Sequence, residues 1–309
     1  LAAGESYVVT KPLTTGTSLT LTGDASDPAI IDASALEGPL VQMNNRHPRS
    51  GTNNYGFFET NTINIKNILI EGLEDGLFSV NKTPYIVNYL NVENVQASVA
   101  EGKTVFDFEG GLMEQMDVTK STLYVPTALT SGTPRRTAAF TGATLYKATV
   151  NPEDAYLPEQ KFTVSHSTLS RVMGLQHAEG TDKTILYIDF NNNIIIDAPG
   201  FTDALGGGQR TLVNYNTFVT SDGTNYTADE EENPLASGNY TEDVIFAGNP
   251  AEGDFTLDDC EAKSKQIGDP RWVMETTDIN NVQWSSLNGQ SDTWYTLDGR
   301  RLQGKPTKK

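Results

Sequence analysis

The sequence predicts an all-β protein: a right-handed parallel β-helix (solenoid) of about seven to nine rungs with a small C-terminal β-hairpin tail. Three observations support this fold class. A strand-like phrase recurs at a nearly constant spacing, the segments between its copies are also strand-like, and no segment has helical periodicity. A unit of this size cannot bury its apolar face alone, so neighbouring units are expected to stack.

The recurring phrase is clearest in residues 62–72, where Ile63 and Ile65 alternate with polar residues until Asn67 breaks the alternation. This pattern indicates a half-buried strand followed by a polar corner. Five further copies place their small polar corner residue at Asn94, Ser121, Ser167, Asn192 and Asn216. From Asn67 onward, the separations between corners are 27, 27, 46, 25 and 24 residues.

The segments between the copies favour a β-helix over a leucine-rich repeat, which has a similar period. A leucine-rich repeat requires Leu at most inward positions and a helical or irregular return, whereas residues 76–80 and 104–108 are strand-like. The separation of 46 residues divides into 22 and 24 if residues 143–145 supply a corner. This division favours an unrecognised rung over one rung with a long insertion.

Charge narrows the class of partner. The chain has 22 Lys and Arg against 40 Asp and Glu, and the net charge of −18 disfavours nucleic acid, anionic membranes and polyanionic ligands. An uncharged ligand is easier to accommodate. Cys260 is the single cysteine, which excludes an intramolecular disulfide. No apolar run is long enough to predict a membrane span.

The N-terminal residues carry a family resemblance. Leu19 and Leu21 share one face of a strand that ends at a Gly23-Asp24 turn, and Ile30 and Ile31 begin a second strand. This opening resembles the N-terminal rung of the pectate-lyase-like β-helix superfamily. The resemblance implies the right-handed parallel β-helix and, for the enzymes on this fold, polysaccharides bound along the outside of one stacked sheet.

Residues 240–272 are expected to close the β-helix domain, which spans residues 1–272. Phe255 and Leu257 would cover the apolar end of the last rung and Trp272 would seal it, because an open rung is an exposed edge. The Gly-Asp-Phe-Thr-Leu strand and the later Ile-Gly-Asp-Pro-Arg-Trp sequence resemble the closing module of uncharacterised, secreted β-helix proteins of gut anaerobic bacteria.

Residues 273–309 are expected to form a linker and a truncated C-terminal hairpin, because Asp298-Gly299 is a strong signal for a two-residue hairpin turn. The stretch resembles the C-terminal tail of exported proteins of the same bacteria, and the chain begins at Leu1 without a leader. These features predict a mature protein that is secreted, periplasmic or on the surface of a Gram-negative bacterium. They leave open the oligomeric state and whether the tail is a sorting signal.

The outward positions between paired apolar residues form the predicted ligand-binding column, which consists of Asn64, Asn91, Asp117, Thr163, Asp189 and Asn214. Amides form paired hydrogen bonds with diols, so the column suits a glycan, although an inert solenoid surface would carry the same residues. A glycoside hydrolase needs two carboxylates roughly 5 to 9.5 Å apart. Asp117 and Asp189 are two or three rungs apart, roughly 10 to 14 Å, which argues against that mechanism.

A polysaccharide lyase needs a base, commonly Arg or Lys, and bound calcium that acidifies the proton beside a uronate carboxylate. Asp107 and Glu109 alternate about Phe108 and are the calcium candidates, although a solvated strand face is the favoured interpretation of the pair. No spacing links this pair to the other catalytic candidates, which are Arg171, Lys183, Asp189 and Arg210.

Two loops carry further candidates. Arg46 and His47 lie in a polar stretch that concentrates basic residues and would suit an acidic sugar, but a solvated loop is the simpler interpretation. The acidic run at 229–233 lacks the alternating ligands and positioned glycine of a calcium loop. The sequence also contains no Ser-His-Asp order, phosphate loop or zinc pattern.

The sequence therefore predicts a secreted or surface-exposed β-helix that binds or presents to glycans, without an identified catalytic apparatus. The leading alternative is a polysaccharide lyase or hydrolase of the pectate-lyase-like type that acts on uronate-containing glycans. An adhesin or structural spacer with a protein partner is a third interpretation.

Overall fold

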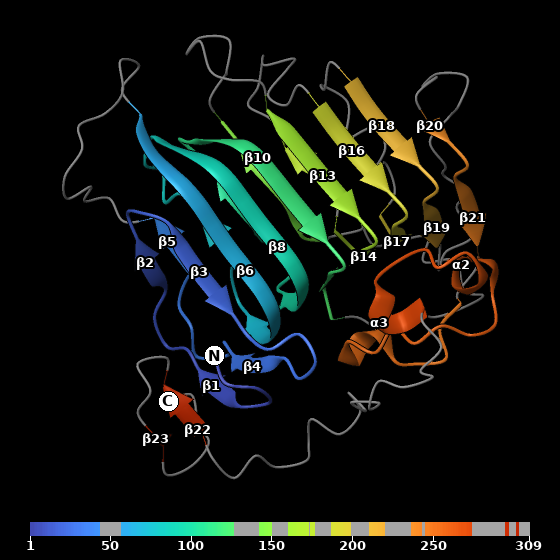
Figure 1. Cartoon of the computed structure of the whole chain (residues 1–309), viewed down its shortest axis with the longest axis horizontal. Coiled ribbons are helices and arrows are strands. Elements are labelled where there is room, and N and C mark those ends of the chain that lie inside the picture. Colours follow the sequence, from blue (N-terminus) through green and yellow to red (C-terminus); the bar gives the residue numbers. More distant parts are fainter. Residues whose placement is uncertain are drawn as a thin grey trace.

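The structure is an all-β arrangement with few helices, built on a large curled parallel sheet and a smaller parallel sheet (Figure 1). It is consistent with a parallel β-helix-like fold. No helix in the described part of the chain is long and apolar enough to cross a membrane. The computed structural model describes residues 1–43, 57–126, 142–149, 160–172, 174–176, 187–198, 210–219, 236–242, 245–273, 294–296 and 301–302.

The strands of the large sheet mostly occur in pairs separated by a corner. The first members of these pairs are β3 (Leu19–Thr22), β10 (Leu112–Thr119), β13 (Lys161–Ser165), β16 (Tyr187–Asn191), β18 (Arg210–Asn214) and β20 (Ala236–Ser237). The second members are β4 (Ala29–Asp32), β11 (Thr122–Tyr124), β14 (Thr168–Ser170), β17 (Ile194–Ile196), β19 (Thr217–Val219) and β21 (Tyr240–Glu242). Two long strands run through the corner and belong to both series, β6 (Phe58–Leu73) and β8 (Tyr85–Val99).

The smaller sheet has six strands, which confirms that the segments between the copies include strands. They are β2 (Leu13–Thr15), β5 (Val41–Met43), β7 (Phe78–Ser79), β9 (Thr104–Phe108), β12 (Thr144–Ala148) and β15 (Leu175–Gln176). Each of these strands pairs in parallel with the next one along the chain.

Parallel pairing joins each strand of the large sheet to the next copy of the repeat. The buried apolar positions align through Ile65, Val92, Val118, Val164, Phe190 and Val213. β10 pairs directly with β13, so the prediction of an unrecognised rung in the 46-residue separation is wrong. The strand that suggested it, β12, belongs to the smaller sheet.

A row of buried aromatic rings runs through the core between the two sheets. Ring centroids are 5.3 Å apart between Phe78 and Phe108, 5.4 Å between Phe108 and Tyr146, 5.9 Å between Tyr146 and Phe162, and 5.6 Å between Phe162 and Phe190. All five side chains are fully buried. The Tyr146–Phe162 contact joins the smaller sheet to the large one.

Replacing Tyr146 by Phe is expected to raise the free energy of unfolding by about 1 kcal/mol. Its buried hydroxyl has no hydrogen-bond partner among the described residues, and burial raises the pKa of this phenol. Urea unfolding of Tyr146→Phe and of the control Tyr89→Phe tests the prediction. The Tyr89 hydroxyl donates to Asp117 at 2.8 Å, so the control should lose stability. A less stable Tyr146→Phe would contradict this account.

The corner uses two adjacent positions with different roles, and the predicted alignment mixed them. At the first position the backbone has positive φ, in Asn67, Asn94, Lys120, His166, Asn192 and Tyr215. At the second position the side chains are buried in Ser121, Ser167, Asn193 and Asn216. The alignment was therefore correct for Asn67, Asn94 and Asn192, and one residue off for Ser121, Ser167 and Asn216.

The second corner position forms a ladder of side chains that bond neighbouring strands. Each oxygen accepts a hydrogen bond from the backbone N–H of the preceding copy. The bonds are Val95 to Ser121 at 3.1 Å, Ser121 to Ser167 at 3.2 Å, Ser167 to Asn193 at 3.0 Å, Asn193 to Asn216 at 3.0 Å and Asn216 to Asn239 at 2.9 Å. The ladder satisfies backbone donors that the turn leaves without a strand partner.

Residues 245–273, which we call the covering segment, pack along the side of the large sheet. The segment contains the 3₁₀ helix η2 (Pro250–Glu252) and the helices α2 (Glu261–Ser264) and α3 (Pro270–Val273), and it lies next to β14 and β21 (Figure 1). Phe255 packs against Tyr124 and Trp272 at 5.5 and 6.1 Å between centroids. The expectation that Phe255, Leu257 and Trp272 seal the end of the last rung is therefore wrong for Phe255 and Trp272, which contact Tyr124 and Thr122 on β11.

The predicted C-terminal hairpin is confirmed. β22 (Trp294–Thr296) pairs antiparallel with β23 (Arg301–Leu302). The Asp298-Gly299 pair, for which the turn was predicted, lies outside the described residues. β22 also pairs in parallel with the N-terminal strand β1 (Ser6–Val8), whose other neighbour is β4. The two ends of the chain therefore meet at one edge of the large sheet (Figure 1).

Candidate functional site

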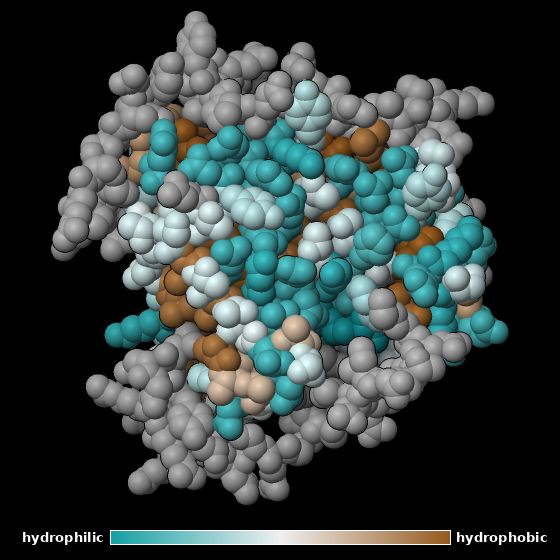
Figure 2. All heavy atoms as spheres, in the orientation of Figure 1, coloured by the Kyte–Doolittle hydropathy of each residue, from teal (hydrophilic) through white to brown (hydrophobic). Residues whose placement is uncertain are grey.

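The outward face of the large sheet carries the predicted column of polar side chains. Strand register aligns Thr20, Asn64, Asn91, Asp117, Thr163 and Asp189. The next aligned residue is Leu212, so placing Asn214 in this column was wrong by two residues. Asn214 aligns with Asn191 in the neighbouring column of the same face. Hydrophilic residues dominate the middle of this face (Figure 2).

Hydrogen bonds between strands fix the orientation of the column at its N-terminal end. Asn64 Nδ2 donates to Thr20 Oγ1 at 3.1 Å, and Asn91 Nδ2 donates to Asn64 Oδ1 at 3.4 Å. These amides lie at the strand spacing of about 4.8 Å; Asn64 is half-buried, and Asn91 is 9% exposed. The arrangement offers a regular array of groups to a ligand that repeats along the sheet.

Asp117 is held as a hydrogen-bond acceptor. Tyr89 Oη and Gln115 Nε2 donate to its Oδ2 atom at 2.8 and 2.9 Å. Burial, together with the bond to Asp117, raises the pKa of Tyr89 to about 12. Two hydrogen bonds to one carboxylate oxygen thus hold the Asp117 side chain in place.

Asp117 and Asp189 are two strands apart, because β13 lies between β10 and β16. This corresponds to about 9.6 Å at the usual strand spacing, the upper end of the range for an inverting glycosidase. Asp189 accepts a hydrogen bond from Asn191 Nδ2. Each carboxylate thus accepts hydrogen bonds from neighbouring protein donors.

Asp107 and Glu109 lie at the smaller sheet, and both have protein partners. Asp107 Oδ1 accepts a hydrogen bond from the backbone N–H of Glu109 at 2.9 Å. The Glu109 carboxylate contacts Lys147 Nζ at 2.8 Å and Lys82 Nζ at 3.2 Å. The bond from Lys147 lowers the pKa of Glu109, and the same bond raises the pKa of Lys147. A catalytic lysine base needs the opposite shift.

Among the remaining basic candidates, the structure describes the side chain of Arg171. Arg171 follows β14 of the large sheet, where its Nη2 atom lies 3.8 Å from Glu101 Oε1. Arg210 is on β18 and is described only by its backbone. Arg46, His47, Lys183 and the acidic run at 229–233 lie outside the described residues. Within the described ranges, no group of three or more His, Cys, Asp or Glu could hold a metal ion.

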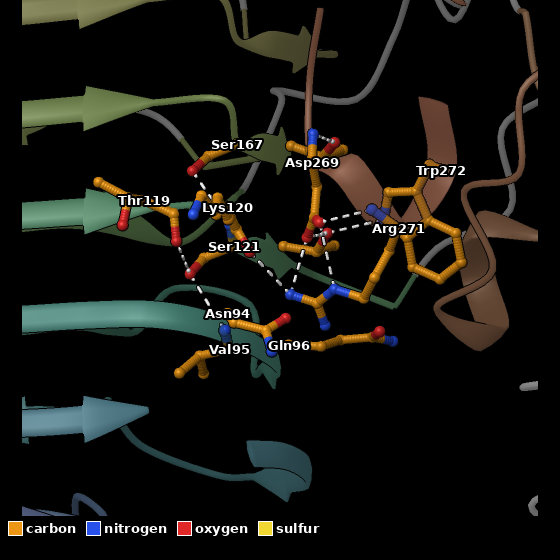
Figure 3. A network of polar contacts seen from close by, with 12 residues as sticks. Asn94, Val95, Gln96, Thr119, Lys120, Ser121, Ser167, Asp269, Arg271 and Trp272 are labelled. Atoms are coloured by element: carbon orange, nitrogen blue, oxygen red, sulfur yellow. Dashed lines mark hydrogen bonds and ion pairs between the residues drawn. The ribbon is translucent and has the colours of Figure 1, made fainter. Parts of the chain in front are cut away.

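A buried polar network that the sequence did not identify fastens the covering segment to the sheet (Figure 3). Asp269 Oδ2 accepts from Thr122 Oγ1 at 2.7 Å and lies 2.8 Å from Arg271 Nη2. Trp272 Nε1 donates to the same Thr122 hydroxyl at 2.8 Å. Burial raises the pKa of Asp269, against the opposing effect of Arg271. The Ile-Gly-Asp-Pro-Arg-Trp sequence was the available signal, but Thr122 could not be paired with it from spacing.

Comparison with known families gives a match for part of the chain. Residues 140–272 match DUF5123, which is described as a domain of unknown function. The matched range covers less than half of the chain and ends at Trp272, within α3 of the covering segment. The comparison with curated proteins finds no match, and neither does the comparison with solved structures.

Proposed function

We propose that the protein is a secreted or cell-surface, right-handed parallel β-helix of about seven to nine rungs that binds carbohydrate along the outward face of its large sheet. The observation that carries the proposal is the aligned column of Asn64, Asn91, Asp117 and Thr163, whose amides are oriented by bonds between strands. Groups fixed before binding lose little conformational entropy when a ligand docks.

The charge of the chain narrows the ligand class. A net charge of −18 repels a polyanion, whereas a neutral glycan meets amides, hydroxyls and carboxylate acceptors that match its own hydroxyl groups. Carboxylates such as Asp117 can accept hydrogen bonds from sugar hydroxyls without a charged partner. We therefore propose a neutral glycan as the ligand.

Two observations weigh against the lyase alternative. The Glu109 carboxylate is neutralised by Lys82 and Lys147, which leaves little affinity for calcium. Lys147 has a raised pKa, so it holds its proton near neutral pH. The lyase is therefore the second candidate, and its activity is one outcome of the test.

A panel of neutral and uronate-containing polysaccharides tests the proposal. We expect a neutral glycan to bind, and we expect no unsaturated product from uronate substrates with or without calcium. Asn91→Ala should weaken binding about five- to tenfold, the loss of one hydrogen bond. Gln42→Ala removes an outward amide from the smaller sheet and serves as the control. Unsaturated product would establish the lyase, and an absence of glycan binding would favour a structural spacer.

A further inference from the structure

Tyr215 stands out in the row of residues at the first corner position. This row consists of Asn67, Asn94, Lys120, His166, Asn192 and Tyr215, all with φ between 49° and 57°. Asn tolerates this left-handed region well, but a bulky side chain there is an outlier that carries strain. Tyr215 therefore occupies a corner for which Asn, found at three of the other positions, is the better local choice.

The Tyr215 side chain faces solvent, so burial of its ring does not offset this backbone strain. It is 54% exposed and is the one exposed large hydrophobic side chain among the described residues. Its ring lies over Gly238, because a Cβ atom at Gly238 would come within 2.6 Å of Tyr215 Cδ1. Gly238 thus leaves room for the ring beside the backbone of the next copy, while the exposed part of the ring remains free for a ligand.

Polar residues precede Tyr215 along the corner. Asn192 and His166 precede Tyr215 at one and two strand spacings, about 4.8 and 9.6 Å. The covering segment is attached along this line, since Gly268 N donates to Asn192 O at 2.9 Å and Arg271 Nη2 donates to Lys120 O at 3.0 Å. The corner therefore presents an aromatic ring at one end of a row of hydrogen-bonding side chains, on a firmly anchored backbone.

We propose that Tyr215 is a stacking subsite for a pyranose ring of a neutral glycan, whose chain runs along the corner past Asn192 and His166. The proposal rests on carbohydrate binding as the function and adds a second location to it, at the corner instead of the sheet face. A sugar ring has an apolar C–H face that packs on an aromatic ring, and its edge hydroxyls reach neighbouring amide and imidazole groups.

Tyr215→Asn separates a binding role from a structural one. It gives the corner the residue found at Asn67, Asn94 and Asn192, so its melting temperature should equal or exceed that of the wild type. Its affinity for the glycan identified in the panel should fall about tenfold. Tyr215→Phe keeps the ring and should bind within about twofold of the wild type. Tyr215→Gly, which also suits positive φ, repeats the loss of the ring.

Isothermal titration calorimetry with the full chain, combined with thermal unfolding, distinguishes the outcomes. Weak binding by Tyr215→Asn and Tyr215→Gly with retained melting temperatures supports the subsite. Unchanged binding by these two variants overturns it while leaving carbohydrate binding intact. Equal losses in Tyr215→Phe and Tyr215→Asn also overturn it, because the hydroxyl and not the ring would then be responsible. A wild-type protein that binds no glycan refutes the proposed function itself.

Discussion

Replacing Asn216 by Ala is expected to lower the free energy of unfolding by about 3 to 5 kcal/mol, because several buried groups lose their partners together. Asn216 Oδ1 accepts from Asn193 N and Asn193 Nδ2, both at 3.0 Å. Its Nδ2 atom donates to Phe190 O at 2.9 Å and to Asn239 Oδ1 at 3.0 Å. The side chain is fully buried, so water cannot replace these bonds.

Asn64→Ala is the matched control for Asn216→Ala. Asn64 bonds its neighbours on the outward face, where the side chain is half-buried and water can take over lost hydrogen bonds. Its loss should cost no more than about 1 kcal/mol. Urea unfolding of both variants gives the comparison. Equal and small losses would show that the buried ladder does not contribute to stability as described.

The repeated pattern of the sequence was sufficient to locate most strands. Alternation placed Ile63 and Ile65 inward, and the structure buries both. Spacing could not separate the two corner positions, because Asn serves both: it tolerates positive φ at Asn192 and donates and accepts in the ladder at Asn193. A period of about 25 residues looks the same whether a given copy is aligned on its first or its second corner position.

Contacts between residues far apart in the sequence were harder to predict. The 46-residue separation is compatible with either an insertion or a missing repeat, because length alone does not distinguish them. Direct pairing of β10 with β13 shows that it is an insertion. Thr122 and Gln96 look like ordinary outward polar residues, yet they bond the covering segment at Asp269 and Gly253. Contacts across some 150 residues leave no local signature.

In the candidate site too, the sequence predicts which residues share a strand face but not which distant residues contact them. Alternation identified Asn64, Asn91 and Asp117 as outward residues of one face, and the register aligns them. Their role in binding remains a prediction. The lysines that neutralise Glu109 come from positions 27 residues before it and 38 residues after it, on neighbouring copies of the repeat. Spacing alone does not pair Glu109 with either lysine.

Replacing Asp269 by Ala is expected to lower the free energy of unfolding by about 3 to 5 kcal/mol and the melting temperature by about 10 °C. The Asp269 side chain is buried and is bonded to Thr122 and to the mostly buried Arg271. Without it, the Arg271 charge has only the Lys120 carbonyl as a partner among these contacts. Glu261→Gln breaks the exposed pair between Glu261 on α2 and Lys265 just after it, and should change stability by less than about 1 kcal/mol.

A double variant tests the cause of this loss. Burial raises the pKa of Asp269 despite the nearby Arg271. The loss of hydration therefore destabilises the buried carboxylate more than its attraction to the guanidinium stabilises it. Asp269→Leu combined with Arg271→Met should therefore be more stable than Asp269→Ala alone, because no charge is left buried without a partner. If the double variant is the less stable of the two, the ion pair itself, and not the unpaired arginine, fastens the covering segment to β11.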